Sequence, residues 1–367
     1  MLQKLLYIPF SICLLLTPRA LKAQVVQPVW PSPEVEQMYA QGREYLSSGN
    51  FKMAIITYNH AIQLAPKQMI LFRDLGNAYY LSGDYKKSIA TLQPLIKSGK
   101  ADDQGYEVMA ASEDATGEKK KAKETLEEGL DKYKNSGILY HELGKHYEQE
   151  NEPAKALETW LDGIHKDPAY HLNYYEAART YLNTKKVVWT IIYGEIFVNK
   201  ERSTPRADET KKMVLDAYKK LFYNTNSDDV PVFGANKKEG MASSFDEAVR
   251  TTLIRLSPVV SDGINTESLT MLRTRFIMEW MNTYAKRFHF SMYTYHDDML
   301  RNGYFEAYNE WIFGKTDNLQ EDEAWKKFHP DAIPSYETWA KQHPLIEEPT
   351  DYHNDGDMDG LFIKKKK

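Results

Sequence analysis

Small residues recur every 34 positions in the first half of the chain, each among apolar and aromatic residues at helical spacing. The series is Gly42, Gly76, Ala110, Gly144 and Ala178. Apolar positions three and four residues apart predict amphipathic helices, and turn-forming pairs divide each period into two. An ordinary helical bundle with coincidental spacing is disfavoured, because five successive frames agree without an insertion. The pattern therefore predicts five stacked pairs of helices.

Each frame is expected to hold a helix A followed by a helix B. The frames are residues 35–68, 69–102, 103–136, 137–170 and 171–204. Small residues at the eighth and twentieth positions mark the place where the two helices cross, because a larger side chain would keep the backbones apart. Aromatic residues at the eleventh, seventeenth and twenty-fourth positions are expected to fill the wider gaps towards the neighbouring frame. The fifth frame keeps the pattern as far as Tyr181 and loses it in its second half.

The first frame carries the pattern most completely. Its key residues are Met38, Gly42, Tyr45, Phe51, Ala54, Tyr58, Ala61 and Pro66. This arrangement resembles the tetratricopeptide repeat (TPR), a helix–turn–helix unit of about 34 residues. The resemblance covers about half of the chain and is specific for the fold only. It implies a TPR helical solenoid of about five repeats, in which stability comes from stacking because one pair of helices leaves a face uncovered.

The resemblance also implies a binding surface, because specific positions of each A helix line the concave side of a TPR solenoid. Here those positions give the candidate partner-binding groove: Tyr39, Arg43, Arg73, Asn77, Tyr80, Glu107, His141, Lys145, Glu148, Tyr175 and Arg179. Four of the five frames place a base in this set, which favours a peptide or protein segment with acidic groups. Arg73 and Asn77 resemble half of a chaperone-binding carboxylate clamp, but the rest of that clamp is missing. The alternative is that these bases only make the helices soluble.

The first residues have the pattern of a secretory signal peptide, residues 1–23, with a short apolar stretch and cleavage after Ala23. Residues 24–34 are then an extended, proline-rich lead-in. We expect an exported protein that is periplasmic or associated with the cell envelope; an uncleaved anchor is the alternative. Cys13 lies inside the apolar stretch, so the remaining chain holds no disulfide and no cysteine metal ligand.

Charge and hydropathy narrow the classes of partner. The signal carries three basic and no acidic residues, so its removal changes the formal net charge from −5 to −8. An acidic chain argues against nucleic-acid binding, which needs a basic face. No later apolar stretch is long enough to cross a bilayer, so we expect no transmembrane span after removal of the signal.

The second half lacks the 34-residue frame but keeps helical spacing. We expect a capping helix over residues 205–223, a linker over 224–240, a smaller all-helical C-terminal domain over 241–345 and a disordered tail over 346–367. The fold class is therefore all-α. Ser244 and Glu247 have the spacing of a capping box, and Gly303 is expected to divide two helices. Residues 272–314 resemble an extension found on uncharacterised envelope TPR proteins of Bacteroidota-type bacteria, a resemblance that implies no activity.

Three groups of residues have some of the features of metal sites. His141 and His146 nearly form a zinc-protease motif, but they are five residues apart and not four, and the intervening residues fit repeat packing. A second group, near a helix boundary, has no ligand spacing: His289, His296, Asp297 and Asp298. A third matches half of a calcium loop without its bidentate glutamate: Asp355, Asp357 and Asp359. We therefore predict no catalytic residue, no metal site and no cofactor, and leave weak calcium binding open.

The function favoured by these patterns is a non-enzymatic scaffold or adaptor in the bacterial cell envelope that binds a protein or peptide in its concave groove. One alternative is an unrecognised hydrolase or metal enzyme in residues 241–345, with the repeats recruiting substrate. Another is a repeat array that mainly self-assembles. The sequence does not identify the partner.

Overall fold

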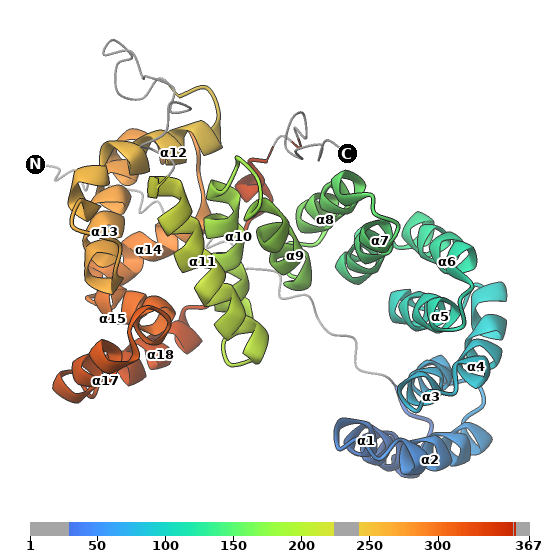
Figure 1. Cartoon of the computed structure of the whole chain (residues 1–367). Helices are drawn as coiled ribbons and strands as arrows, with labels where there is room; N and C mark the ends of the chain where they lie inside the picture. Colours follow the sequence, from blue (N-terminus) through green and yellow to red (C-terminus); the bar gives the residue numbers. More distant parts are fainter. Residues whose placement is uncertain (1–28, 224–241, 355, 357–367) are drawn as a thin grey trace, which may run out of the picture.

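The computed structural model describes residues 29–223, 242–354 and 356. These residues form helices joined by turns, with no strand among them, so the all-α prediction is confirmed. Figure 1 shows two regions: helices α1–α9 form an open arc, which we call the repeat arc, and α10–α18 form a denser C-terminal body. The expected signal peptide and the linker at 224–240 lie outside the described residues.

The five frames hold the ten helices of the solenoid. The A helices are α1 (Pro33–Ser47), α3 (Met69–Leu81), α5 (Asp103–Ala115), α7 (Gly137–Gln149) and α9 (Leu172–Tyr181). The B helices are α2 (Phe51–Leu64), α4 (Tyr85–Lys97), α6 (Lys119–Lys132), α8 (Pro153–Lys166) and α10 (Val188–Lys200). Helix α10 therefore supplies the B helix of the fifth frame, where the sequence pattern fades.

Local sequence sets the turns between A and B helices. Asn50 caps α2 by accepting a hydrogen bond from the Met53 amide, and Asp84 caps α4 in the same way. The residue before each cap is a glycine with a positive φ, 74° at Gly49 and 81° at Gly83. Glycine adopts this left-handed conformation without the steric cost that a side chain would add.

The small residues at the eighth positions allow close contact within a repeat. A Cβ on Gly42 would lie 2.5 Å from Cε1 of Tyr58, and one on Gly144 would overlap the indole of Trp160. Tyr58 and Trp160 occupy the twenty-fourth position of their frames. The expectation that this position fills the gap towards the neighbouring repeat was therefore wrong: its aromatic ring lies directly over the glycine of its own repeat.

Helix α10 is buried on every side. Each residue from Val188 to Val198 is buried, which is the pattern of a helix enclosed by others rather than lying on a surface. It packs against α9, against α11 (Pro205–Tyr223) and against α12 (Phe245–Arg255). The fifth frame loses the repeat pattern because α10 meets partners on faces that a terminal B helix would expose to water.

The remaining elements complete the C-terminal body. They are η2 (Ser257–Val260), α13 (Thr266–Thr283), α14 (Ser291–Arg301), α15 (Phe305–Asn309), the π-helical η3 (Glu310–Gly314), α16 (Lys315–Asp317), α17 (Leu319–Phe328), α18 (Ala332–Gln342) and η4 (Pro349–Asp351). As predicted, Ser244 caps α12 by accepting from the Glu247 amide, and Gly303 separates α14 from α15.

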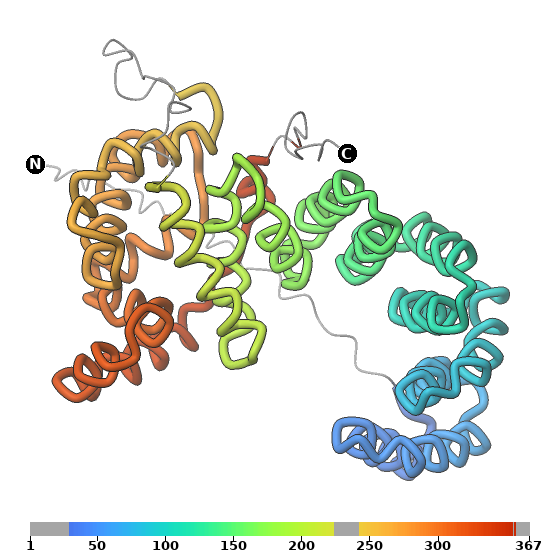
Figure 2. The backbone as a smooth tube through the Cα atoms, viewed as in Figure 1, coloured from blue at the N-terminus to red at the C-terminus, as the bar shows by residue number. Residues whose placement is uncertain are grey.

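The buried side chains of the C-terminal body form one core. A single cluster extends from Leu157 in α8 to Ala340 in α18 and includes residues of α9, α10 and α11. Helix α11, expected as a cap, is itself covered by η3 and α16. Figure 2 shows the backbone passing from the repeat arc into this body without a break at α9 and α10. The last repeat and the C-terminal helices thus share their core.

The expectation of a disordered tail from residue 346 was wrong for residues 346–354. Glu347 forms an ion pair with Lys200 of α10 at 2.6 Å, and its side chain is 6 % exposed. His353 stacks on Phe245 with ring centroids 4.6 Å apart, and Asn354 is buried. Local composition concealed this, because the segment's few apolar and aromatic groups pack on distant helices. No helix in the described ranges is both long and apolar enough to cross a membrane.

Candidate partner-binding face

Helices α3, α5, α7 and α9 lie along the inside of the repeat arc, with α4, α6 and α8 outside them (Figure 1). We use the term inner face for the A-helix side chains of this inside row. The structure brings seven of the eleven candidate groove residues into one polar row: Tyr80, Glu107, His141, Lys145, Glu148, Tyr175 and Arg179. Tyr39, Arg43, Arg73 and Asn77 lie on α1 and α3, towards the N-terminal end.

The centre of the inner face is a half-buried group of charges from α5 and α7. Lys145 donates to both carboxylate oxygens of Glu142, at 2.8 and 3.1 Å. Burial, with the negative charge of Glu142 adding to it, raises the pKa of Glu107 to about 7. Burial also raises the pKa of Tyr80, and the negative charge of Glu107 adds to this increase. Glu107 therefore changes its charge near neutral pH, unlike an ordinary surface glutamate.

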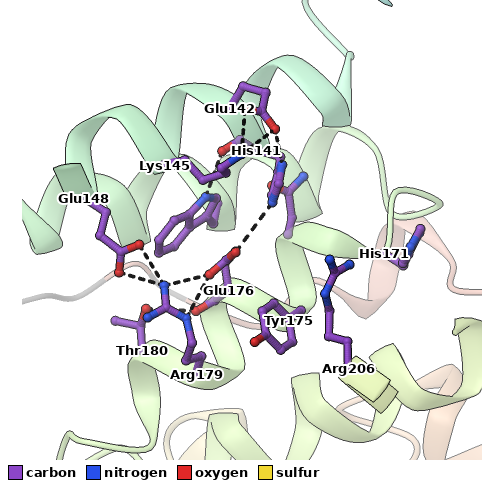
Figure 3. A network of polar contacts seen from close by, with 12 residues as sticks. His141, Glu142, Lys145, Glu148, His171, Tyr175, Glu176, Arg179, Thr180 and Arg206 are labelled. Atoms are coloured by element: carbon purple, nitrogen blue, oxygen red, sulfur yellow. Dashed lines mark hydrogen bonds and ion pairs between the residues drawn. The ribbon is translucent and has the colours of Figure 1, made fainter. Parts of the chain in front are cut away.

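Arg179 joins α9 to α7 (Figure 3). Its guanidinium donates to both oxygens of Glu148, at 2.7 and 2.9 Å, and to Glu176 at 2.8 and 3.0 Å. Burial disfavours the charged guanidinium, but the two carboxylates outweigh burial and raise the pKa of Arg179. Arg179 is therefore held in position before any partner binds.

His141 is an internal member of the row rather than a surface contact. It is 5 % exposed, and its ring lies between two carboxylates, with Nδ1 2.9 Å from Glu142 and Nε2 3.7 Å from Glu176. Figure 3 shows it pointing from α7 towards α9. The hydrogen bonds and charges of the two glutamates outweigh burial and raise the pKa of His141. His141 therefore links adjacent repeats.

The row continues onto α11. The hydroxyl of Tyr175 donates to Glu209 at 3.2 Å, and the guanidinium of Arg206 lies 5.4 Å from the centre of the Tyr175 ring. Neither Arg206 nor Glu209 belongs to a repeat frame, so the position rules for TPR helices do not reach them. The inner face therefore extends beyond the fifth repeat.

At the N-terminal end of the repeat arc, one candidate groove base is ion-paired and another is not. Arg73 is paired with Asp74 and Asp102, each at 2.7 Å. Arg43 is exposed and lies 5.9 Å from the Tyr39 ring, and no ion pair joins it to any described residue. Trp30, from the lead-in, lies against Tyr39 with ring centroids 4.6 Å apart. Arg43 is therefore the groove base that offers an unneutralised charge.

Sequence reasoning identified the bases but missed the acids that neutralise three of them. Asp74, Glu142 and Glu176 stand at the sixth position of their frames, directly after the fifth position. They are ion-paired with Arg73, Lys145 and Arg179 respectively. Their 34- and 68-residue spacing is visible in the sequence, so examining the sixth position would have found them. The first frame has Ala40 there, which agrees with the unpaired Arg43.

The histidines that resemble a zinc motif have different partners. His141 contacts Glu142 and Glu176, whereas His146 is buried with Asp114 at 3.8 Å and Glu150 at 3.4 Å. Within residues 29–223 and 242–354, no three side chains of the ligating types are grouped to hold a metal ion. The candidate calcium residues Asp355, Asp357 and Asp359 lie outside the described residues.

The second candidate metal group, on and next to α14, does not come together in the structure. Asp297 forms an ion pair with Arg301 at 2.7 Å, and His289 is half-exposed beside Asp351. His296 instead points into the core, where its Nε2 lies 3.0 Å from Glu195 of α10. The sequence pattern therefore joined side chains that face different surroundings.

Glu195 is the centre of a fully buried polar cluster. It forms an ion pair with Arg273 of α13 and accepts a hydrogen bond from Tyr308 at 2.8 Å. Burial alone would raise the pKa of Glu195, but the charges of Arg273 and His296 lower it to about 2. The adjoining cavity has a volume of about 10 Å³, close to the space of one water molecule. The cluster therefore joins helices and leaves no room for a substrate.

Comparisons with known proteins support the prediction that the first frame is a repeat of this type. Residues 38–68 match the family model described as tetratricopeptide repeat. No protein among the curated sequences matches the chain. The repeat assignment for the later frames rests on the 34-residue period and on the paired helices.

Several solved structures show a weak similarity. MamA from residue 41 to its end, from Desulfovibrio magneticus RS-1, is 17 % identical over 35 % of this chain and 73 % of its own, with a TM-score of 0.32. YrrB, described as a TPR protein with an unusual peptide-binding site, is 16 % identical over 49 % and 84 %, with a TM-score of 0.31. The TPR2AB domain of yeast Sti1 in a complex with pHSP90 is 16 % identical over 67 % and 98 %, with a TM-score of 0.27.

Proposed function

We propose that this protein is a non-enzymatic scaffold that binds a protein or peptide segment on the inner face of the repeat arc. We further propose that it is exported and acts in the cell envelope, on the strength of the signal-peptide pattern in residues 1–23. The observation that carries the binding proposal is the continuous polar and aromatic row from α3 to α9. Side chains from four successive A helices supply it, and ion pairs hold several of them in place.

A preformed row of this kind favours binding. Ordering long side chains on association costs roughly 0.5–1.5 kcal/mol each. Arg179 and Lys145 are already fixed by Glu148, Glu176 and Glu142, so a partner does not have to order them. The inner face therefore has the character of a binding surface that keeps its shape.

The paired bases change the partner chemistry expected from sequence. Three of the four groove bases are neutralised within the chain, so the inner face does not select a uniformly acidic segment. Arg43 remains available to a carboxylate at the N-terminal end. Towards α9 the row offers donors and acceptors of both signs. We infer a partner segment with one acidic anchor near α1 and polar groups along the rest.

Site-specific crosslinking tests the location. A photo-crosslinking residue at Asn77, which is half-buried on α3, should capture a partner from the native envelope. The same residue at Gln63, exposed on the outer helix α2, is the control. The proposal requires an adduct from Asn77 that Gln63 does not give; absence of an adduct at Asn77, or the same adducts at both positions, would refute it.

A charge reversal tests the acidic anchor. Arg43→Glu should weaken capture of that partner by about tenfold, the size expected for one charge-assisted contact. Lys52→Glu makes the same charge change in the same repeat, on a side chain that is exposed on α2. Equal binding by both variants, measured as dissociation constants for the identified partner, would contradict the role of Arg43.

The buried polar cluster around Glu195 gives no support to the hydrolase or metal-enzyme alternative. This cluster is centred on Glu195 and Arg273, and its atoms are enclosed by packed helices. A reaction at this cluster would need a substrate to displace the core. The cluster is better explained as the polar joint between α10, α13, α14 and α15.

A further inference from the structure

A cavity with a volume of about 690 Å³ lies in the C-terminal body, away from the inner face. Its walls come from the start of α13, from α15 with the π-helical turn η3, and from α17. The volume falls in the range of small-ligand pockets, roughly 300–1,000 Å³. The proposed protein-binding function does not use this cavity, so its lining needs a separate explanation.

The lining is strongly acidic. Its carboxylates are Glu267, Glu306, Glu310, Glu321 and Asp322, and His329 is the one basic-type side chain among the residues that line it. Lys326 and Asp317 stand nearby, the first ion-paired with Asp322 at 2.7 Å and the second with Lys219 at 3.9 Å. The cavity therefore carries an excess of negative charge that its surroundings only partly compensate.

Two of these carboxylates meet at Gly314. A Cβ on Gly314 would lie 2.5 Å from Oε2 of Glu310 and 2.7 Å from Oδ1 of Asp322. The absence of a side chain therefore lets both oxygens approach the same place. Glu310 opens the π-helical turn, and π-helical turns recur at functional sites because the extra residue changes the direction of side chains.

The Asp322 carboxylate has an unused oxygen. Its side chain is 2 % exposed; Oδ2 accepts from Lys326, whereas Oδ1 is buried without a hydrogen-bond partner. A buried acceptor without a donor costs about 1–3 kcal/mol. Burial, with the charges of Asp322 and Glu306, raises the pKa of Glu310 to about 7. Lys326 therefore offsets only part of the negative charge of this pair, and Asp322 Oδ1, the oxygen near Gly314, has no donor.

The remaining wall indicates which positive partner fits. Trp325 lines the cavity and stacks on His329 with ring centroids 4.5 Å apart. An aromatic face next to carboxylates attracts ammonium and guanidinium groups. A bare metal ion fits poorly, because no three ligating side chains converge within the described residues, and the space greatly exceeds the volume of an ion.

We propose that this cavity binds an organic cation, with an ammonium or guanidinium group seated between Glu310 and Asp322 and its alkyl part against Trp325. The cation comes either from a free polyamine or from a lysine or arginine side chain of a polypeptide. Binding displaces the proton that Glu310 carries below about pH 7, where burial and the neighbouring acids hold its pKa. Occupancy therefore increases as the pH rises through about 7, and binding at that pH releases a proton.

Isothermal titration of the full chain tests this proposal. The probes are spermidine, a short acetylated peptide amide with one lysine, the same peptide with arginine, and Mg²⁺ alone. Saturable binding of spermidine or of either peptide is expected, in buffers of differing ionisation enthalpy that report the released proton. Tighter binding of spermidine assigns a free polyamine, and tighter binding of a peptide assigns a side chain. Binding of Mg²⁺ alone, or of no probe, overturns the proposal.

Variants separate the site from general charge attraction. Glu310→Gln should weaken binding by about tenfold or more and abolish the proton release. Glu323→Gln removes the same charge from an exposed position of α17 that does not line the cavity, and it should bind as the native chain does. Glu310→Gln relieves a repulsion between acids, so it should fold with unchanged or higher melting temperature. Equal affinities of the two variants would overturn the assignment.

Discussion

In α1–α7 of the repeat arc, buried side chains form separate clusters, each shared by a few neighbouring helices. One continuous cluster, from Leu157 to Ala340, instead joins α8 and α9 to the C-terminal body. The first cluster, for example, involves α1, α2 and α3 only. Repeat arrays depend on contacts between adjacent units, so each part of the arc is stabilised locally. The body instead depends on contacts between residues far apart in sequence.

The two regions also differ in how far their ion pairs are exposed to solvent. In the repeat arc, ion pairs lie along the inner face, where Arg179 and Glu148 remain partly exposed. In the body, Glu195 and Arg273 are almost completely buried. A partly exposed pair contributes at most about 1 kcal/mol, whereas removing one partner of a buried pair costs about 3–5 kcal/mol. The same type of interaction therefore lies partly exposed on a surface in one region and holds buried helices together in the other.

The largest effect should follow from Arg273→Met, which leaves Glu195 buried without its counter-charge. We expect a loss of about 3–5 kcal/mol in the free energy of unfolding. Hydrogen exchange should show the loss throughout α10–α15 and leave α1–α4 unchanged. Arg275→Met, on an exposed position of the same helix, is the control. A loss confined to α13, or spread equally over α1–α4, would contradict the comparison.

The ion pair between Glu195 and Arg273 should also make the free energy of unfolding depend on pH. The folded pKa of Glu195 is about 2 against an ordinary value of 4.5. Its contribution of about 3 kcal/mol is therefore complete above pH 4.5 and lost as the pH falls towards 2. In Arg273→Met, burial should raise this pKa instead. The stability difference between the two proteins should then narrow on acidification, as measured by urea unfolding at several pH values.

A smaller effect is expected from Gly144→Ala in the repeat arc. The new methyl group would overlap Trp160, so overpacking should cost about 1–3 kcal/mol. Helix propensity alone predicts the opposite sign, a gain of about 1 kcal/mol. Thermal unfolding and hydrogen exchange of α7 and α8 would measure it. A gain in stability would show that the crossing is looser than the contact indicates.

The smallest effect should come from Ser112→Ala. Oγ of Ser112 lies 2.8 Å from that of Ser88 in the buried contact between α4 and α5. Removing it leaves the Ser88 hydroxyl without this partner, which should cost about 1 kcal/mol. Increased exchange should be limited to α4 and α5. Loss of protection in α10 would show that the arc is not stabilised locally.

Sequence reasoning succeeded where a physical requirement repeats. Gly42 and Gly144 recur because every helix crossing needs a small residue, and the 34-residue period follows. It failed where contacts join residues that have no periodic relation. Glu195 and Arg273 are 78 residues apart, and neither has a spacing that indicates the other. The carboxylates at Gly314 likewise meet only through the π-helical turn.

The inner face illustrates an intermediate case. Its positions could be predicted from the repeat, but the charge it presents could not be read from the bases alone. Arg73, Lys145 and Arg179 are neutralised by acids one position away from those considered. Arg43 is the exception because its frame has no such acid. The net charge of a surface depends on which acids form ion pairs with its bases, and this depends on the direction in which the side chains point.

The enclosed position of α10 has a consequence for the order in which the chain matures. During synthesis, α1–α7 emerge close in time to the helices that share their buried clusters and can fold as they appear. The apolar surface of α10 stays uncovered until residues 245–340 have followed, because those residues supply its remaining neighbours. During that interval the nascent protein exposes an apolar segment near its growing C-terminal end. Val188–Val198 is therefore a segment that a chaperone for unfolded chains would bind during that interval.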